Sequence, residues 1–275
     1  MVDPEKDVIN SNPRICDPGG SNYLEFYSGI FDAVYCALNP FVSIPELDIR
    51  KVFLMDEDEI PAEPSLKQIN ETAARRLRFF KEQPTPKAIA DLEKRSGTAI
   101  RWETVRQACK LSSIADLCRA ELGRIGALRD NLRNQDSENA VWQYCLENNV
   151  FPPREDRVPT ILEQSIATLF HKLNYSSAIL SDAFGCDQCE FKLNDLFDAP
   201  WKDGLVHFDV RRIYPPDTTL LVVVGFDTVV TKICGNRSQF SRVEMEDMFE
   251  GFWSSSDTDD LWWLSTLEKQ RLGIQ

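Results

Sequence analysis

The chain has 275 residues, of which 43% are hydrophobic and 27% are charged. This length can bury a full core as one large domain or as two small ones. The formal net charge is −13, which argues against a nucleic acid partner because phosphate-backbone binding needs a basic surface. No apolar run approaches the roughly 20 residues of a membrane helix, and the first residues do not resemble a signal peptide. We therefore expect a cytoplasmic protein with no membrane partner.

The first forty residues divide into an arm and a predicted helix. Residues 1–20 contain three prolines and a Gly-Gly pair without any periodicity, so we expect an irregular N-terminal arm. From Ser21 to Leu38 apolar residues recur at the spacing of an amphipathic helix, and Pro40 ends the pattern. The aromatic character of this stripe places the predicted helix in the core.

The next hundred residues are predicted to be mainly helical. Residues 49–55 indicate a short strand, and capping residues and prolines then divide residues 65–146 into a series of helices. One of these helices begins at Ser113 and contains Gly123 and Gly126. Because glycine destabilises a helix interior, we expect another element to pack closely against this helix.

Strand patterns dominate after a polar connector. Phe151–Pro159 is the best candidate for a domain sub-boundary, and Thr160 with Glu163 predicts a capping box that starts a helix. Residues 205–211 alternate between apolar and polar side chains. The run Thr218–Cys234 is rich in β-branched residues and is split by Gly-Phe-Asp, which predicts a hairpin in the middle of the sheet.

The second arm of this hairpin carries Thr228 and Lys232 on one face. We expect this arm nearer an edge, with Lys232 on a solvated face. Ser241 and Glu244 then predict the start of a helix that reaches Phe252. A short helix around residues 261–264 is expected to follow an acidic loop.

Together these elements predict an α+β fold. A helical N-terminal and middle region packs on a mostly antiparallel sheet that the C-terminal half builds. We expect residues 21–275 to form a single domain.

Two groups of residues are candidates for chemistry. His207, Asp209 and Arg211 share one face of a predicted strand, where a His–Asp pair could move protons and an arginine could hold an anion. The alternation of a half-buried strand predicts the same three polar residues without any catalytic role. Cys186 and Cys189 have the spacing of a metal-binding pair, but no second pair accompanies them. We therefore expect no metal and no cofactor.

The C-terminal segment is the candidate partner-binding region. Its aromatic residues stand beside acidic ones, which suits a protein-binding surface. The alternative is that the segment packs back on the sheet. The residues concerned are Trp253, Trp262, Trp263, Asp259 and Asp260.

Four stretches of the chain resemble a bacterial domain-of-unknown-function family that is best represented in bacilli. They are Trp102–Leu128, Val158–Leu173, Leu220–Cys234 and Phe249–Trp253. The resemblance implies no activity, ligand or catalytic residue. It favours one continuous domain, because the similar stretches lie on both sides of the connector.

The function that these observations favour is the binding of another protein by a non-enzymatic, cytoplasmic chain of uncharacterised role. The excess of acidic over basic residues indicates a basic partner. An immunity-type protein that neutralises a basic toxin is one concrete form of this hypothesis. The alternative is an enzyme of unrecognised class with its site near His207, Asp209 and Arg211.

Overall fold

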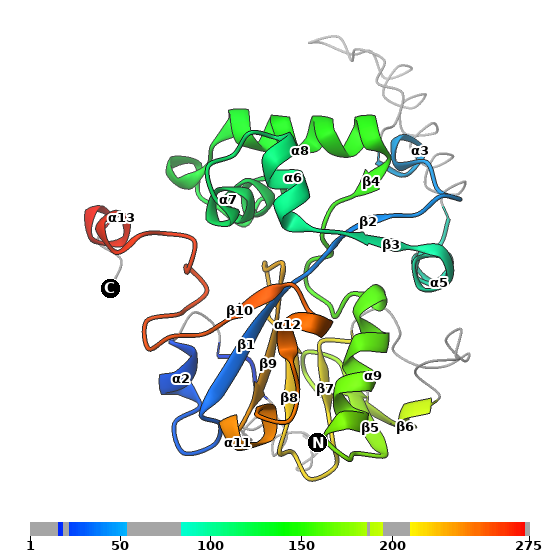
Figure 1. Ribbon diagram of the computed structural model, residues 1–275. Helices are drawn as coiled ribbons and strands as arrows, with labels where there is room; N and C mark the ends of the chain where they lie inside the picture. The colour runs from blue at the N-terminus through cyan, green and yellow to red at the C-terminus, as the bar shows by residue number, and fades with distance from the viewer. Residues whose placement is uncertain (1–15, 19–21, 54–83, 186–187, 195–209, 273–275) are drawn as a thin grey trace, which may run out of the picture.

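The computed structural model describes residues 16–18, 22–53, 84–185, 188–194 and 210–272. Within these ranges the chain forms a seven-stranded antiparallel sheet and a separate three-stranded sheet. Figure 1 shows the small sheet and helices α6, α7 and α8 in the upper half, and the large sheet with α2, α9 and α11 in the lower half. The α+β prediction is confirmed.

The strands of the large sheet, in spatial order, are β10 (Gly251–Trp253), β1 (Ala33–Leu38), β9 (Val230–Gly235), β8 (Leu221–Val224), β7 (Arg212–Tyr214), β5 (Ser177–Ser181) and β6 (Gln188–Lys192). Those of the small sheet are β3 (Thr98–Ile100), β2 (Phe41–Ser43) and β4 (Val150–Phe151). The helices are α2 (Tyr23–Phe26), α3 (Ile49–Phe53), α5 (Pro86–Ser96), α6 (Trp102–Ala108), α7 (Ile114–Arg124), η2 (Asp130–Leu132), α8 (Gln135–Asn148), η3 (Thr160–Leu162), α9 (Glu163–Lys172), α11 (Arg237–Phe240), α12 (Met245–Met248) and α13 (Thr266–Arg271). In the ranges described above, none of these helices has the length and apolar character to cross a membrane.

The β8–β9 hairpin lies in the middle of the large sheet, as predicted. Its first arm is buried on both faces, because Leu221 and Val223 enter one core while Leu220 and Val222 enter the other. Helix α9 covers the second of these faces with its own apolar side chains. The expectation that the second arm lies near an edge is wrong, since β9 pairs with β8 on one side and with β1 on the other.

The predicted helix from Ser21 to Leu38 is wrong. Helix α2 has only four residues, and the chain then turns through Gly29, whose φ of 76° few other residues adopt. Strand β1 follows, with all six of its residues buried between β9 and β10. A strand covered on both faces is apolar throughout, so its sequence satisfies a helical pattern equally well.

Other element predictions also need correction. Residues 49–53 form helix α3 and not a strand. The stretch predicted as one helix from Ser241 to Phe252 begins directly after α11 and contains the short helix α12 and the first two residues of strand β10. Residues 261–264 form a turn before α13. The helix predicted between residues 65 and 83, and residues 205–209 of the predicted strand, lie outside the described residues.

Close packing at Gly123 is confirmed, whereas Gly126 lies past the end of α7 with a φ of 80°. A Cβ atom at Gly123 would lie 2.2 Å from Oε1 of Glu138 on α8. That carboxylate is bound to Arg133, with its Oε1 3.1 Å from Nε of the arginine. The absence of a side chain at Gly123 therefore allows α7 and α8 to approach around the buried carboxylate of Glu138, which is paired with the half-buried Arg133.

We expect Gly123→Ala to lower the free energy of unfolding by about 1–3 kcal/mol, because the methyl group must displace the Glu138 carboxylate. In an open helix the same change would be stabilising by up to about 1 kcal/mol. Urea unfolding measures the difference. In a Glu138→Ala background the cost of Gly123→Ala should largely disappear. An unchanged or higher stability of Gly123→Ala alone would contradict the close contact.

Polar contacts connect the two sheets. The Glu250 carboxylate, next to β10, accepts a hydrogen bond from the backbone N–H of Trp102 at 3.0 Å and so occupies the start of α6. The indole Nε1 of Trp102 donates to the Asn39 carbonyl at 2.8 Å, and Thr231 donates to the Asn39 side chain at 2.6 Å. Asn39 follows β1 directly, so these bonds hold α6 against the end of the large sheet.

A second connection joins α5 to α9. Nζ of Lys94 lies 2.9 Å from Oε2 of Glu163, whose side chain is 5% exposed. The predicted capping box of Thr160 and Glu163 is therefore wrong, since this carboxylate pairs with α5 and no side chain caps α9. The neighbouring residue Glu93 accepts from the backbone N–H of Ile161 at 3.1 Å. Both contacts lie where the predicted connector passes from the small sheet to the large one.

Candidate functional site

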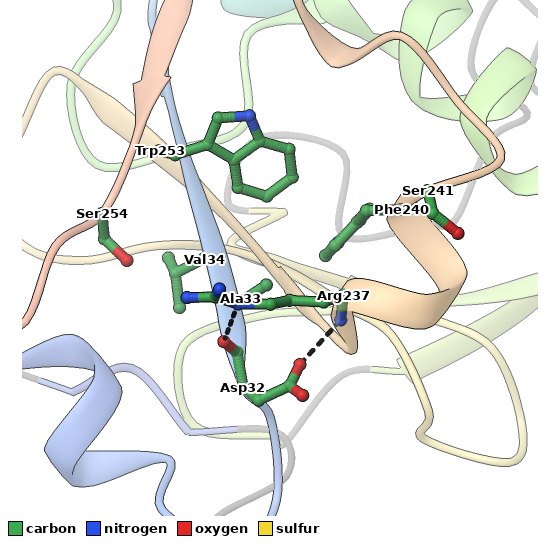
Figure 2. Close-up of a pocket in the computed structure, with 8 residues that line it drawn as sticks. All are labelled: Asp32, Ala33, Val34, Arg237, Phe240, Ser241, Trp253 and Ser254. Atoms are coloured by element: carbon green, nitrogen blue, oxygen red, sulfur yellow. Dashed lines mark hydrogen bonds between the residues drawn. The ribbon is translucent and has the colours of Figure 1, made fainter.

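A pocket of about 340 Å³ opens where strands β1 and β10 and helix α11 meet. Figure 2 shows its lining: Trp253 and Phe240 lie next to each other, and the Arg237 side chain extends below them past Ala33 and Val34. The remaining lining residues are Asp32, Ser241 and Ser254. The walls are thus mostly apolar, and Arg237 is the one cation among the residues that line them.

Trp253 forms one wall of the pocket, and its side chain remains 40% exposed. The indole meets the rings of Tyr35 and Phe240 edge to face, with centroids 5.1 and 5.3 Å apart. Its Nε1 donates to Oε1 of Glu246 at 2.9 Å. These contacts hold the ring in one orientation, so the exposed indole is a preorganised surface.

Arg237 is anchored through its main chain. Its backbone N–H donates to Oδ1 of Asp32 at 2.7 Å, and Nε makes a long contact of 3.4 Å with the Asp32 carbonyl. Within the described part of the chain, the Nη atoms of Arg237 have neither a hydrogen-bond acceptor nor a carboxylate in ion-pair range. The exposed guanidinium therefore brings a positive charge to the pocket.

The pocket lies beside the last strand at this end of the sheet, counting the strands that the structure describes. Leu38 donates to the Glu250 carbonyl, and Ser254 donates to the Val34 carbonyl. In an antiparallel pair, only every second residue of a strand exchanges backbone hydrogen bonds with a given neighbouring strand. Since Glu250 and Ser254 bond to β1, the backbone N–H and C=O of Trp253 point away from β1. This places outward-facing main-chain groups next to the exposed indole.

The other predicted partner-binding residues have internal contacts. Trp263 is only 5% exposed, and Trp262 packs on Phe252 with ring centroids 4.8 Å apart. Both oxygens of Asp259 accept from Lys269, the shorter contact being 2.7 Å. Asp260 accepts from the Tyr23 hydroxyl at 2.6 Å. Of the three tryptophans predicted to bind a partner, Trp253 is the most exposed, since Trp262 is half-buried and Trp263 is buried.

The prediction that Lys232 marks a solvated face is wrong, because the residue is 0% exposed. Its Nζ lies 2.7 Å from Oδ1 of Asp17 and 2.9 Å from Oδ1 of Asp260, and the Tyr23 ring lies below it at 4.8 Å. Burial alone would lower the pKa of Lys232, but the two carboxylates outweigh burial and raise it. Through this cluster, Asp17 near the N-terminus and Asp260 near the C-terminus both contact the central strand β9.

The catalytic candidates are only partly described. His207 and Asp209 lie outside the described residues, so a shared site with Arg211 stays a prediction. Arg211 itself donates to the Gly225 carbonyl at 3.3 Å and lies 4.0 Å above the Phe226 ring. It also lies 3.6 Å from Oδ2 of Asp156.

The two cysteines predicted as metal candidates are also only partly described. Cys186 lies outside the described residues, and Cys189 is a half-buried free cysteine on β6. Oxygens of Glu155, Asp156 and Asp227 lie within 4.8 Å of one another near Arg211. Asp156 also accepts from the backbone N–H of Asp227 at 2.6 Å, and such acidic groups are common at protein surfaces without an ion.

Comparison with known protein families shows which family the chain belongs to. Residues 19–264 match the family described as "Protein of unknown function (DUF2711)". The chain belongs to this family. The expected resemblance to a family of unknown function is thereby confirmed, and the match covers the pocket and both sheets. Neither the curated proteins nor the solved structures contain a match to the chain.

The candidates predicted from the sequence include Trp253 but none of the other residues that line the pocket. The sequence predicts a helix over Asp32 and Ala33, although Asp32 precedes strand β1 and Ala33 is its first residue. Arg237 and Phe240 carried no motif, and Arg237 is 205 positions away from its partner Asp32. Local patterns cannot report a contact over such a separation, so no signal in this one sequence predicts the site.

Proposed function

We propose that this chain is a non-enzymatic protein that binds another protein, and that an apolar side chain of the partner enters the pocket and packs against Trp253 and Phe240. The observation that carries the proposal is the 40% exposure of Trp253 on the wall of an apolar pocket. Tryptophan is among the residues that most often dominate the binding energy of protein interfaces. Neighbouring contacts preorganise the ring, which lowers the entropy lost on binding.

A protein partner suits this location better than a metabolite does. The outward-facing main-chain groups at Trp253 can pair with an extended segment of a partner, as in strand addition at a sheet edge. The pocket volume of about 340 Å³ is at the small end of the range for ligand sites. A side chain of the partner, together with the main chain beside it, can occupy such a space, while the strand edge supplies the rest of the interface.

The net charge of −13 favours a basic partner, because opposite charges accelerate association. An immunity-type protein that neutralises a basic toxin is one form of this proposal. The same proposal includes a bacterial source, from a family best represented in bacilli. It also includes a cytoplasmic location. The alternative of an enzyme with His207, Asp209 and Arg211 at its site remains a second proposal, supported by the sequence pattern of these three residues alone.

The test replaces Trp253 with alanine. The wild-type chain, Trp253→Ala and Leu267→Ala are used as baits in a lysate of the source organism, and captured proteins are quantified by mass spectrometry. We expect one basic protein to be captured by the wild type and depleted by about tenfold or more with Trp253→Ala, since interface tryptophans commonly contribute 2 kcal/mol or more. The captured protein is then purified and its affinity measured directly.

Leu267→Ala is the matched control, because Leu267 is 66% exposed on α13 and takes no part in the pocket. This variant should capture the same protein as the wild type does. Thermal unfolding of each bait confirms that it is folded. Equal capture by the wild type and Trp253→Ala would show that the pocket is not the binding surface.

A further inference from the structure

Arg237 is the feature of the pocket that apolar binding does not explain. The chain has 44 acidic and 31 basic residues, so a basic side chain has many carboxylates available as partners. Asp32 is adjacent, yet its Oδ1 accepts from the backbone N–H of Arg237, and no ion pair joins the two side chains in the described structure. The guanidinium therefore keeps its forked donors available beside two aromatic walls (Figure 2).

The donor pattern of a guanidinium matches the two oxygens of a carboxylate. In a polypeptide, an apolar side chain and a carboxylate share one carbon atom only at the C-terminal residue. The pocket offers the complementary pair: Trp253 and Phe240 for the side chain, and Arg237 for the carboxylate, all within one lining. The preceding residues of such a segment could pair with the outward-facing groups at Trp253.

We propose that the pocket binds the C-terminal residue of a partner protein, with its apolar side chain against Trp253 and Phe240 and its terminal carboxylate on Arg237. This inference rests on the proposed function, since it names the part of the partner that enters the pocket. It is compatible with a partner that is basic elsewhere, because a free C-terminus is present whatever the composition of the chain. It also excludes an internal side chain as the occupant.

The experiment uses peptides with a defined end. A library with randomised C-terminal residues and free carboxyl ends is selected on the full-length wild-type chain. Enriched sequences are synthesised as free acids and as matched C-terminal amides, and their affinities are measured by fluorescence anisotropy. We expect the enriched peptides to end in an apolar residue and the acids to bind about tenfold or more tightly than the amides, as is typical of hydrogen bonds to charged groups.

Variants of the chain separate the two contributions. Arg237→Gln should reduce the affinity for the acid to that for the amide, while Arg237→Lys should keep part of the difference because it keeps the charge. Arg242→Gln is the control, since Arg242 is an exposed arginine in the next turn that does not line the pocket. Trp253→Ala should weaken the binding of acid and amide alike.

The outcomes distinguish the inference from the function on which it rests. If acid and amide bind equally and both depend on Trp253, the carboxylate inference is wrong and the binding pocket stands. If Arg237→Gln and Arg242→Gln reduce binding of the acid equally, Arg237 is not the carboxylate site. A selection that yields no peptide dependent on Trp253 would overturn both proposals.

Discussion

Lys232→Ala is expected to lower the free energy of unfolding by about 3–5 kcal/mol, which is the usual cost of removing one partner from a buried ion pair. The lysine is fully buried and contacts Asp17, Asp260 and the Tyr23 ring. Without it, two partly buried carboxylates lose the cation that they share. Denaturant unfolding monitored by circular dichroism measures the loss.

The control for this prediction removes the charges of Lys232, Asp17 and Asp260 in one variant. Lys232→Met alone keeps most of the side-chain volume but leaves both carboxylates, so it should also be strongly destabilising. A triple variant that adds Asp17→Asn and Asp260→Asn should recover much of that loss, because a buried ion pair replaced as a whole is often nearly neutral. A loss below about 1 kcal/mol for Lys232→Ala, the range of exposed ion pairs, would contradict the central role of the cluster.

The pH dependence of stability should depend strongly on Glu163. Burial raises the pKa of this carboxyl to about 7, although Lys94 opposes the shift. A carboxyl whose pKa is higher in the folded state binds more protons folded than unfolded, so its contribution to stability decreases as the pH rises. The loss begins near the ordinary value of 4.5 and is complete above about 7. Between pH 5.5 and pH 8.5 we expect Glu163 to account for a loss of about 2 kcal/mol.

Glu163→Gln isolates this contribution, because an amide does not titrate. We expect the stability of this variant to fall by about 2 kcal/mol less than that of the wild type over the same pH range. Glu147→Gln, at an exposed position of α8, should keep the wild-type pH dependence. The quantity to compare is the change in the free energy of unfolding with pH. The absolute stability is not informative here, since the substitution also changes the contact with Lys94. If the free energy of unfolding changes equally with pH in Glu163→Gln and in the wild type, ionisation of the Glu163 carboxyl does not destabilise the folded protein, and the prediction is wrong.

The two clusters also show why sequence reasoning placed their residues wrongly. Thr228 and Lys232 share one face of the second arm of the hairpin, which predicts a solvated face near the edge of the sheet. The sequence also predicts a helix where β1 lies, and β1 is the strand that pairs with β9 on the side away from β8. Glu163 occupies the third position after Thr160 and looked like a capping residue, whereas α5 supplies Lys94 as its partner. In both cases the deciding partner is distant in the sequence.

The sequence by itself determined the class of the fold, the central position of the β8–β9 hairpin and the membership of a family of unknown function. The hairpin was predictable because β-branched residues around a glycine-containing turn are a local signal. The sequence also indicates the C-terminal aromatic segment as a candidate binding region, with Trp253, Trp262 and Trp263 as equal candidates. Only the tertiary structure decided which aromatic residue is exposed, and that Arg237, Phe240 and the start of β1 join it in one pocket. These contacts arise from the pairing of β1 with β9 and β10, and pairing between distant segments leaves no periodic trace in a single sequence.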